Sequence, residues 1–271
     1  MRLGLIYILA TLAIAASALG QAQSAQPAQP AKSPQPAQSV QPVRDQDELR
    51  NLVQRLTPAM PPRGYTPPVG HPNPSAIKVA RLHYSGGGDW YWGPSSIPNL
   101  LTYVRQNTDF LVDTMERQVT ITDPELFRYP FLFATGHGVM SFTAEEKERL
   151  RTYLTGGGFL FVNDSYGMAE TFKKEMANLF PEREVVELPF DHPIYHCFYD
   201  FPNGPPKIHE HDGKPPRGFA IIVNGRVVVY FLVEGDIGDG WEDPQVHNDP
   251  PDKRLQAFKM GTNLIAYALL Y

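Results

Sequence analysis

Short apolar runs alternate with amphipathic helical patterns along residues 77–270, and this alternation restricts the fold more than any other feature. The run Phe159–Val162 has no polar residue between its apolar ones, as expected for a strand of a parallel sheet that helices cover on both faces. A predicted helix precedes it, beginning at the capping box Thr143-x-x-Glu146 and ending at Gly156–Gly158. We therefore expect a three-layer α/β fold with a largely parallel, doubly wound sheet.

The same patterns predict the other elements. Strands are expected at 77–84, 110–112, 118–121, 129–134, 184–188, 219–223 and 226–231, and helices at 96–106, 167–179 and 252–270. Asn224-Gly225, between the last two strands, is a strong signal for a tight hairpin, so one edge of the sheet is expected to be mixed. Ser96 is expected to cap its helix.

Residues 1–20 have the pattern of a secretory signal peptide. Met1 and Arg2 precede the apolar run Leu3–Leu19, and small residues up to Gly20 allow cleavage. The alternative is an uncleaved anchor, since the run is about long enough to span a thin bilayer. We expect an exported protein, periplasmic or extracellular, that touches a membrane only through this segment if it is not cleaved.

A long proline-rich stretch separates this segment from the predicted fold. Residues 21–44 are mostly Gln, Ala, Pro and Ser and predict a disordered tether. Residues 45–74 predict a short helix followed by a proline-rich linker. Residues 21–74 hold 12 of the 27 prolines of the chain, so the α/β domain is expected to cover residues 75–271.

Charge and cysteine content exclude several classes of function. The formal net charge of the 271-residue chain is −5, which does not suit binding of nucleic acid. The one cysteine, Cys197, excludes an intrachain disulfide framework and a four-thiolate zinc site, and we expect it to be a small buried residue. The triple glycine at 86–88 lacks the Lys and Ser/Thr of a phosphate-binding loop, so no nucleotide and no other cofactor is expected.

Four segments are expected to leave strands at the carboxyl edge of the sheet, where open α/β sheets bind ligands. They are 85–92, 136–138, 163–167 and 235–243, and they combine glycines with aromatic and acidic residues that suit a small polar ligand. The first three should line one pocket, because right-handed crossovers return each parallel strand in the same direction. The candidate ligand-binding residues are Gly87, Gly88, Asp89, Trp90, Gly136, His137, Asp164, Ser165, Tyr166, Asp239 and Trp241.

A metal site has only weak sequence support. His209 and His211 share a face if their segment is extended, but no motif of fixed spacing supplies a third ligand. We expect no bound metal, and these two histidines are the first ligands to test if one is found.

The order of several motifs resembles a known family. GGGDWY (86–91), YPFLFATGHG (129–138), FTAEEKERLRTYLTGGGFLFVNDSYG (142–167) and ELPFDHPIYHCFYDFP (187–202) are similar to the domain of unknown function 4159 family over about residues 76–270. That family resembles the class I glutamine amidotransferase-like α/β fold and has no established activity. The resemblance implies an exported or cell-envelope protein of bacteria.

The amidotransferase comparison implies roles for a few residues. Gly136–Gly138 stands where such enzymes have an oxyanion hole, and Ser165 stands where they have a nucleophilic cysteine. The expected H-x-E pair is missing, and only His247 lies in the comparable loop before the last helix. A serine without a base to accept its proton is inert.

Two functions follow as hypotheses. The favoured one is a non-catalytic module on an amidotransferase-like scaffold that binds a small polar ligand or an envelope protein. The alternative is a hydrolase that uses Ser165 at a nucleophile-elbow position, or Asp89 and Asp164 with a histidine; His137 and His247 are the candidate bases.

Overall fold

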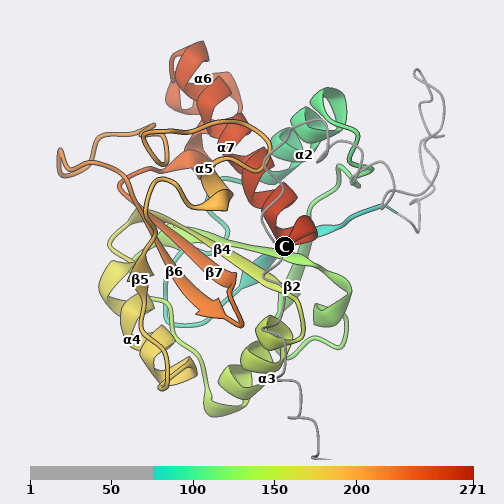
Figure 1. The fold of residues 1–271 in the computed structure, drawn as a ribbon, viewed down its shortest axis with the longest axis vertical. Coiled ribbons are helices and arrows are strands. Elements are labelled where there is room, and N and C mark those ends of the chain that lie inside the picture. Colours follow the sequence, from blue (N-terminus) through green and yellow to red (C-terminus); the bar gives the residue numbers. More distant parts are fainter. Residues whose placement is uncertain (1–75) are drawn as a thin grey trace, which may run out of the picture. The chain divides into compact units, whose positions relative to one another are not determined.

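The structure is a computed structural model that describes residues 76–271. The predicted signal peptide, tether and linker, residues 1–74, lie outside the described residues. Within residues 76–271, seven strands form one sheet in the order β2-β1-β3-β4-β7-β6-β5 (Figure 1). The strands are β1 Val79–His83, β2 Arg117–Thr120, β3 Phe131–His137, β4 Phe159–Tyr166, β5 Val186–Glu187, β6 Arg217–Val223 and β7 Arg226–Val233.

Helices cover both faces of this sheet. They are α2 Ser96–Asn107, α3 Ala144–Thr155, α4 Ala169–Leu179, α5 Ile237–Gly240, α6 Pro244–His247 and α7 Pro251–Leu270, with single 3-10 turns η1 Leu126–Arg128 and η2 Pro193–Tyr195. The buried residues of α2, α5 and α7 belong to one apolar cluster, and those of α3 and α4 belong to another. Figure 1 shows the two groups of helices on opposite sides of the strands. The fold is therefore a three-layer α/β structure, as predicted.

The strand directions explain where a ligand site can form. Strands β2, β1, β3, β4 and β7 run parallel to one another, whereas β6 is antiparallel to both of its neighbours, β7 and β5, so one edge is mixed as predicted. From β1 the chain passes to β2 on one side and then returns to β3 on the other side. Helix α2, after β1, and helix α3, after β3, cover opposite faces. The carboxyl ends of β1 and β3 thus form a topological switch point, where sheets of this kind bind ligands.

Alternation along the central strands fills both apolar layers. In β3, Phe131 and Phe133 pack in the cluster with α7, while Leu132 and Ala134 pack in the cluster with α3 and α4. Phe131 lies opposite Phe159 of β4 in the parallel register, and their ring centroids are 5.4 Å apart. Burial on both faces explains why these strands have no polar alternation.

Local signals set the ends of α3 as predicted. The Thr143 hydroxyl accepts a hydrogen bond from the Glu146 backbone N–H at 3.2 Å, and the Glu146 carboxylate accepts one from Thr143 N–H at 2.8 Å. After the helix, a Cβ at Gly158 would lie 2.3 Å from the Tyr153 ring, so only glycine fits where the chain turns into β4.

The predicted hairpin is also present. Asn224 and Gly225 join β6 to β7 and have φ angles of 52° and 81°. Two successive residues in the left-handed region are typical of a type I′ turn, which matches the twist of the two strands. The prediction of a mixed edge is therefore confirmed: the hairpin lies where it was predicted, and its turn has the geometry that Asn224-Gly225 favours.

Two strands are longer than predicted. The segments 136–138 and 163–167 were expected to be loops, but β3 continues to His137 and β4 continues to Tyr166. Gly136 and Asp164 still pair in register, so the ladder extends through polar residues that periodicity assigns to a loop. The polar side chains Asn163, Asp164 and Ser165 are held as part of a strand.

Smaller elements differ from the prediction as well. Residues 110–112 form no strand but a single bridge between Ile77 and Val112. Ser96 is the first residue of α2 rather than its cap, and its hydroxyl donates to the Gly93 carbonyl at 2.7 Å. Cys197 is buried as expected, and burial raises the pKa of its thiol to about 12.

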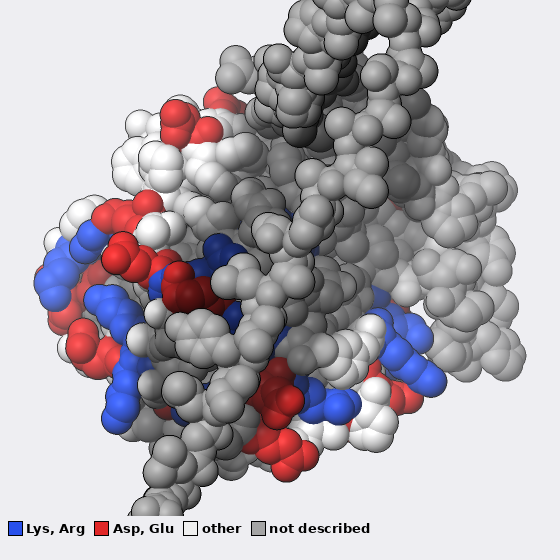
Figure 2. Space-filling model, turned by 60° about the horizontal axis from the view of Figure 1, so that its bottom comes forward, with Lys and Arg blue, Asp and Glu red and all other residues white. Residues whose placement is uncertain are grey.

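Charged side chains on α3 and α4 are paired rather than gathered by sign. Lys147 lies 3.1 Å from Glu175, and Arg151 pairs with Glu182. Where the described residues are visible in Figure 2, Lys and Arg side chains alternate with Asp and Glu. No helix among residues 76–271 is both long enough and apolar enough to cross a membrane.

Candidate functional site

Asp89 and His137 meet at the switch point between β1 and β3. Asp89 lies in the loop after β1, and its carboxylate accepts a hydrogen bond from the backbone N–H of His137 and contacts His137 Nδ1 at 3.0 Å. Both side chains are partly exposed, His137 by 41% and Asp89 by 27%. Among residues 76–271, no hydrogen-bond partner is present for His137 Nε2. The pair therefore presents an oriented imidazole to the solvent.

Arg81 holds the loop that carries Asp89. Its buried guanidinium donates to the carbonyl oxygens of Trp92 at 2.6 Å and Gly93 at 2.8 Å. It also pairs with Glu116 at 2.8 Å, which balances its charge. Because a buried arginine is stable only when its donors are satisfied, this loop is tied to the end of β1.

The glycines of this region allow close backbone approach. A Cβ at Gly136, which has a φ of +136°, would lie 2.6 Å from the Tyr84 hydroxyl and 2.7 Å from the Asp89 carboxylate. A Cβ at Gly88 would lie 2.8 Å from the Tyr84 hydroxyl, whereas Gly87 has open space around it. Gly88 and Gly136 thus shape the site by packing against Tyr84.

The aromatic candidates divide into surface and core residues. Trp90 stacks on His83 with ring centroids 4.0 Å apart, and Tyr166 is half exposed and donates its hydroxyl to Asp212 at 3.1 Å. Trp241, in contrast, is fully buried, and its indole N–H donates to the Ala257 carbonyl at 2.8 Å. The structure therefore places the predicted ligand-binding residue Trp241 in the core beneath α7, away from the surface.

Asn163 joins β4 to the segment after β7. Its amide donates to Asp236 Oδ1 at 2.8 Å, and its carbonyl oxygen accepts from the Gly238 N–H at 3.1 Å. Glu234 and Asp236 both have positive φ angles, 61° and 47°, which are unfavourable for residues with side chains. The two residues with strained backbone therefore lie at the hydrogen bond between Asp236 and Asn163.

Ser165 lacks the surroundings of a nucleophile. It is fully buried in β4, and its hydroxyl lies 3.2 Å from the Thr135 hydroxyl and 3.4 Å from the Asn163 amide nitrogen. Within residues 76–271, no histidine forms a hydrogen bond with it. It also lacks the positive φ of the strained turn that exposes a nucleophile. The strand geometry of β4 therefore turns Ser165 inward.

Asp164 is a buried carboxyl group with a perturbed pKa. Burial raises its pKa to about 6, and the negative charge of Asp236 adds to this, while the hydrogen bond from the Met168 N–H and the neighbouring His211 and His137 act in the opposite direction. Carboxyl groups with raised pKa values cluster at functional sites.

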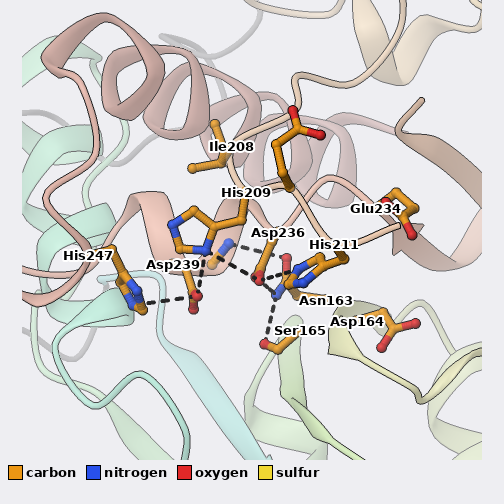
Figure 3. Close-up of polar contacts among 12 residues, drawn as sticks. Asn163, Asp164, Ser165, Ile208, His209, His211, Glu234, Asp236, Asp239 and His247 are labelled. Atoms are coloured by element: carbon orange, nitrogen blue, oxygen red, sulfur yellow. Dashed lines mark hydrogen bonds and ion pairs between the residues drawn. The ribbon is translucent and has the colours of Figure 1, made fainter. Parts of the chain in front are cut away.

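Histidines and carboxylates from three segments converge beside Asn163 (Figure 3). His209 Nδ1 lies 3.1 Å from Asp239 Oδ2, and His247 Nε2 lies 3.4 Å from the same oxygen. The other nitrogen of His209, Nε2, contacts Asp249 Oδ1 at 2.9 Å. His209, Asp239 and His247 each offer one possible metal-ligand atom, and these atoms lie within 4.8 Å of one another.

His211 contacts Asp236 rather than Asp239. Its Nε2 lies 3.2 Å from Asp236 Oδ2, and the same oxygen lies 3.9 Å from His209 Nδ1, so Asp236 links the two histidines. The hydrogen bond with Asp236 raises the pKa of His211, and the hydrogen bond with Asp239 raises the pKa of His209 to about 9. Burial raises the pKa of Asp236; burial also acts to raise that of Asp239, but its contacts with His209, His247 and Trp92 outweigh this and lower it.

Three residues of this region were not among the candidate ligand-binding residues: Trp92 and Asp236, which lie in the predicted segments 85–92 and 235–243, and Asp249, which lies outside them. Trp92 donates its indole N–H to Asp239 Oδ1 at 3.0 Å, and its ring packs edge-on against His137 at 4.8 Å. A usable signal was the spacing Asp236-x-x-Asp239 directly after a buried strand, which places two acidic residues on one helical turn at the carboxyl edge.

A family model described as Domain of unknown function (DUF4159) matches residues 78–269. No curated protein matches the chain.

Proposed function

We propose that this chain, which belongs to the DUF4159 family, is a non-catalytic module that binds a small polar ligand at the carboxyl edge of its sheet. The observation that carries the proposal is the pair Asp89 and His137 at the switch point between β1 and β3. Ligands of open α/β sheets bind at this place, and here it holds a partly exposed imidazole with one nitrogen free of described partners.

The chemistry of the pair favours a ligand with hydroxyl groups. In the tautomer whose Nδ1–H donates to Asp89, His137 Nε2 is an acceptor for a ligand O–H. Tyr91, two residues after Asp89, is 62% exposed and lies edge-on to Trp90 at 5.7 Å, so the loop that carries Asp89 also offers an exposed aromatic ring. Saccharides combine hydroxyl donors with apolar faces that pack on such rings, and we propose them as the ligand class.

The proposal is tested by ligand-observed NMR with mono- and disaccharides, and with short peptides as the competing class. We expect saccharide signals to lose intensity with the wild-type chain and not with His137→Ala. His196→Ala is the matched control, because His196 forms a similar exposed pair with Asp200. Equal binding by wild type and His137→Ala, or binding of peptides alone, contradicts the proposal.

The hydrolase alternative has less support. It requires a base within hydrogen-bond reach of Ser165, whereas the Ser165 hydroxyl contacts Thr135 and Asn163 among the described residues. We expect the chain to hydrolyse activated esters no faster in wild type than in Ser165→Ala. An activity that Ser165→Ala abolishes would restore the alternative.

We also propose that the chain is exported and that its fold is related to the class I glutamine amidotransferase-like fold. The pattern of residues 1–20 supports a signal peptide and therefore export to the periplasm or the exterior. In that compartment an envelope protein is the alternative binding partner to a small polar ligand. Mass spectrometry should find a mature N-terminus between Leu19 and Gln21; a cytoplasmic pool that keeps Met1 contradicts export. The glycine-bearing end of β3 and the parallel sheet support an amidotransferase-like scaffold.

A further inference from the structure

We propose that His209, Asp239 and His247 bind a divalent transition metal ion such as Zn²⁺. Their three possible ligand atoms lie within 4.8 Å of one another. Zinc binds imidazole nitrogen and carboxylate oxygen at about 2.0–2.2 Å, so two ligand atoms on a tetrahedral ion lie about 3.3 Å apart. The separations from Asp239 Oδ2 to His209 Nδ1, 3.1 Å, and to His247 Nε2, 3.4 Å, are close to this value.

Three separate segments deliver these ligands. His209 lies in the loop before β6, Asp239 in the short helix α5 after β7, and His247 is the last residue of α6. Figure 3 shows all three side chains pointing toward one another from these segments. A site built from different segments of one edge is held by the whole fold rather than by a local turn.

His209 and Asp239 each form a hydrogen bond through the atom that faces away from the site, so their facing atoms, Nδ1 and Oδ2, can bind the ion. His209 Nε2 contacts Asp249 Oδ1 at 2.9 Å, and Asp249 is 93% buried, since only 7% of its side chain is exposed. Asp239 Oδ1 accepts the indole N–H of Trp92 at 3.0 Å, which leaves Oδ2 facing the two imidazoles. Metal-binding histidines commonly donate their other ring N–H to a carboxylate, which orients the ring and raises its basicity. Asp249 and Trp92 are therefore positioning residues for the site.

Two buried atoms lack a hydrogen bond in the absence of an ion. Within residues 76–271, His247 Nε2 and Asp249 Oδ2 are buried without a hydrogen-bond partner. A buried polar atom without a partner is destabilising by about 1–3 kcal/mol, so such atoms in a native site call for an explanation. An ion between the ligands would satisfy His247 directly.

The local charge also favours a cation. Asp236, Asp239 and Asp249 are all buried here, with side chains 1%, 6% and 7% exposed. Two imidazole nitrogens with one carboxylate suit zinc, cobalt, nickel or iron, whereas magnesium and calcium prefer oxygen ligands alone. We therefore choose a transition metal over an alkaline-earth ion.

The test is titration of the chelator-treated full chain with Co²⁺, which reports tetrahedral coordination through its visible spectrum, and with Zn²⁺ in calorimetry. We expect one ion per chain. His247→Ala and Asp239→Asn should each weaken binding by at least about 100-fold, and Asp249→Asn by about 10- to 100-fold through its effect on His209.

Controls separate this site from adventitious binding and from loss of fold. His196→Ala removes an exposed histidine of a similar Asp–His pair and should bind the metal like wild type. His247→Ala should keep the far-UV circular dichroism of wild type, because α6 has no buried residue. Absence of binding in wild type, or equal binding by His247→Ala and His196→Ala, overturns the proposal and leaves an ion-free network of ion pairs. Saccharide binding at Asp89 and His137 is a separate measurement, so the two proposals fail independently.

Discussion

Trp92 donates its indole N–H to Asp239 Oδ1 at 3.0 Å, although the two residues are 147 positions apart in the chain. The same indole ring packs edge-on against His137, 4.8 Å away. Trp92 therefore connects the pair at the switch point with the cluster of histidines and carboxylates after β7. Arg81, which binds the Trp92 carbonyl, holds this connection in place.

Trp92→Phe should destabilise the protein by about 1–3 kcal/mol, because it leaves one oxygen of the buried Asp239 carboxylate without its donor. Urea unfolding measures the change. Tyr91→Phe is the control, since Tyr91 is largely exposed, and its effect should stay within about 0.5 kcal/mol. Equal unfolding midpoints for Trp92→Phe and wild type would show that the hydrogen bond contributes nothing.

Gly136→Ala should be much more damaging than Gly138→Ala. Both glycines have positive φ angles, +136° and +86°, so both substitutions strain the backbone by about 1–2 kcal/mol. Only at Gly136 does the new Cβ also meet Tyr84 and Asp89, which adds about 1–3 kcal/mol for overpacking. Thermal unfolding compares the two variants, and a loss for Gly138→Ala as large as that for Gly136→Ala would contradict the packing argument.

Asp164→Asn should stabilise the protein at neutral pH. Burial raises the pKa of Asp164 from 3.8 to about 6, so between these values the folded state binds more protons than the unfolded state. Stability from this group therefore falls as pH rises through the window, and the full penalty is present above it. The asparagine variant should be more stable by up to about 3 kcal/mol at pH above 6.

The same substitution should make little difference in acid. Below about pH 3 the Asp164 carboxyl is largely protonated in both states, so the two proteins should unfold at the same urea concentration. The charges of Asp236, His211 and His137 also act on Asp164, and the comparison is therefore made between variants at each pH. A stability difference that does not change between pH 3 and pH 7.5 would contradict this assignment.

Asn163→Asp should be strongly destabilising, by about 3–5 kcal/mol, because it replaces an amide donor to Asp236 with a second buried negative charge. Chemical unfolding at neutral pH measures the loss. Ser165→Ala is the matched control in the same strand, and it removes only neutral contacts with Thr135 and the Asn163 amide, so its effect should be about 1 kcal/mol. Similar losses for the two variants would mean that Asn163 does not carry the link to Asp236.

Local interactions made much of the fold predictable. The capping box of Thr143 and Glu146 acts over three residues, and the turn at Asn224 and Gly225 depends on the φ preferences of two, so neither needs the rest of the chain. The apolar run Phe159–Val162 correctly predicted a strand buried on both faces, since a sheet covered by two helical layers leaves no polar side for alternation.

Long-range packing decided what the sequence pattern left open. Periodicity predicted a loop at Asn163–Gly167, but pairing with β3 extends β4 through Tyr166 and turns Ser165 inward. Trp241 was a candidate ligand-binding residue of the segment 235–243, but it lies in the core beneath α7. Strand length and burial depend on partners that lie far away in the sequence.

The candidate site shows the same division. The sequence by itself identified the carboxyl edge and the residues Asp89, His137, Asp239 and His247 that lie along it. Only the tertiary structure paired His137 with Asp89 and brought His247 to Asp239. The physical reason is that local patterns and crossover handedness show which segments leave parallel strands at the carboxyl edge, whereas the partner of a charged side chain is set by distances of a few ångströms between segments that the chain itself does not connect.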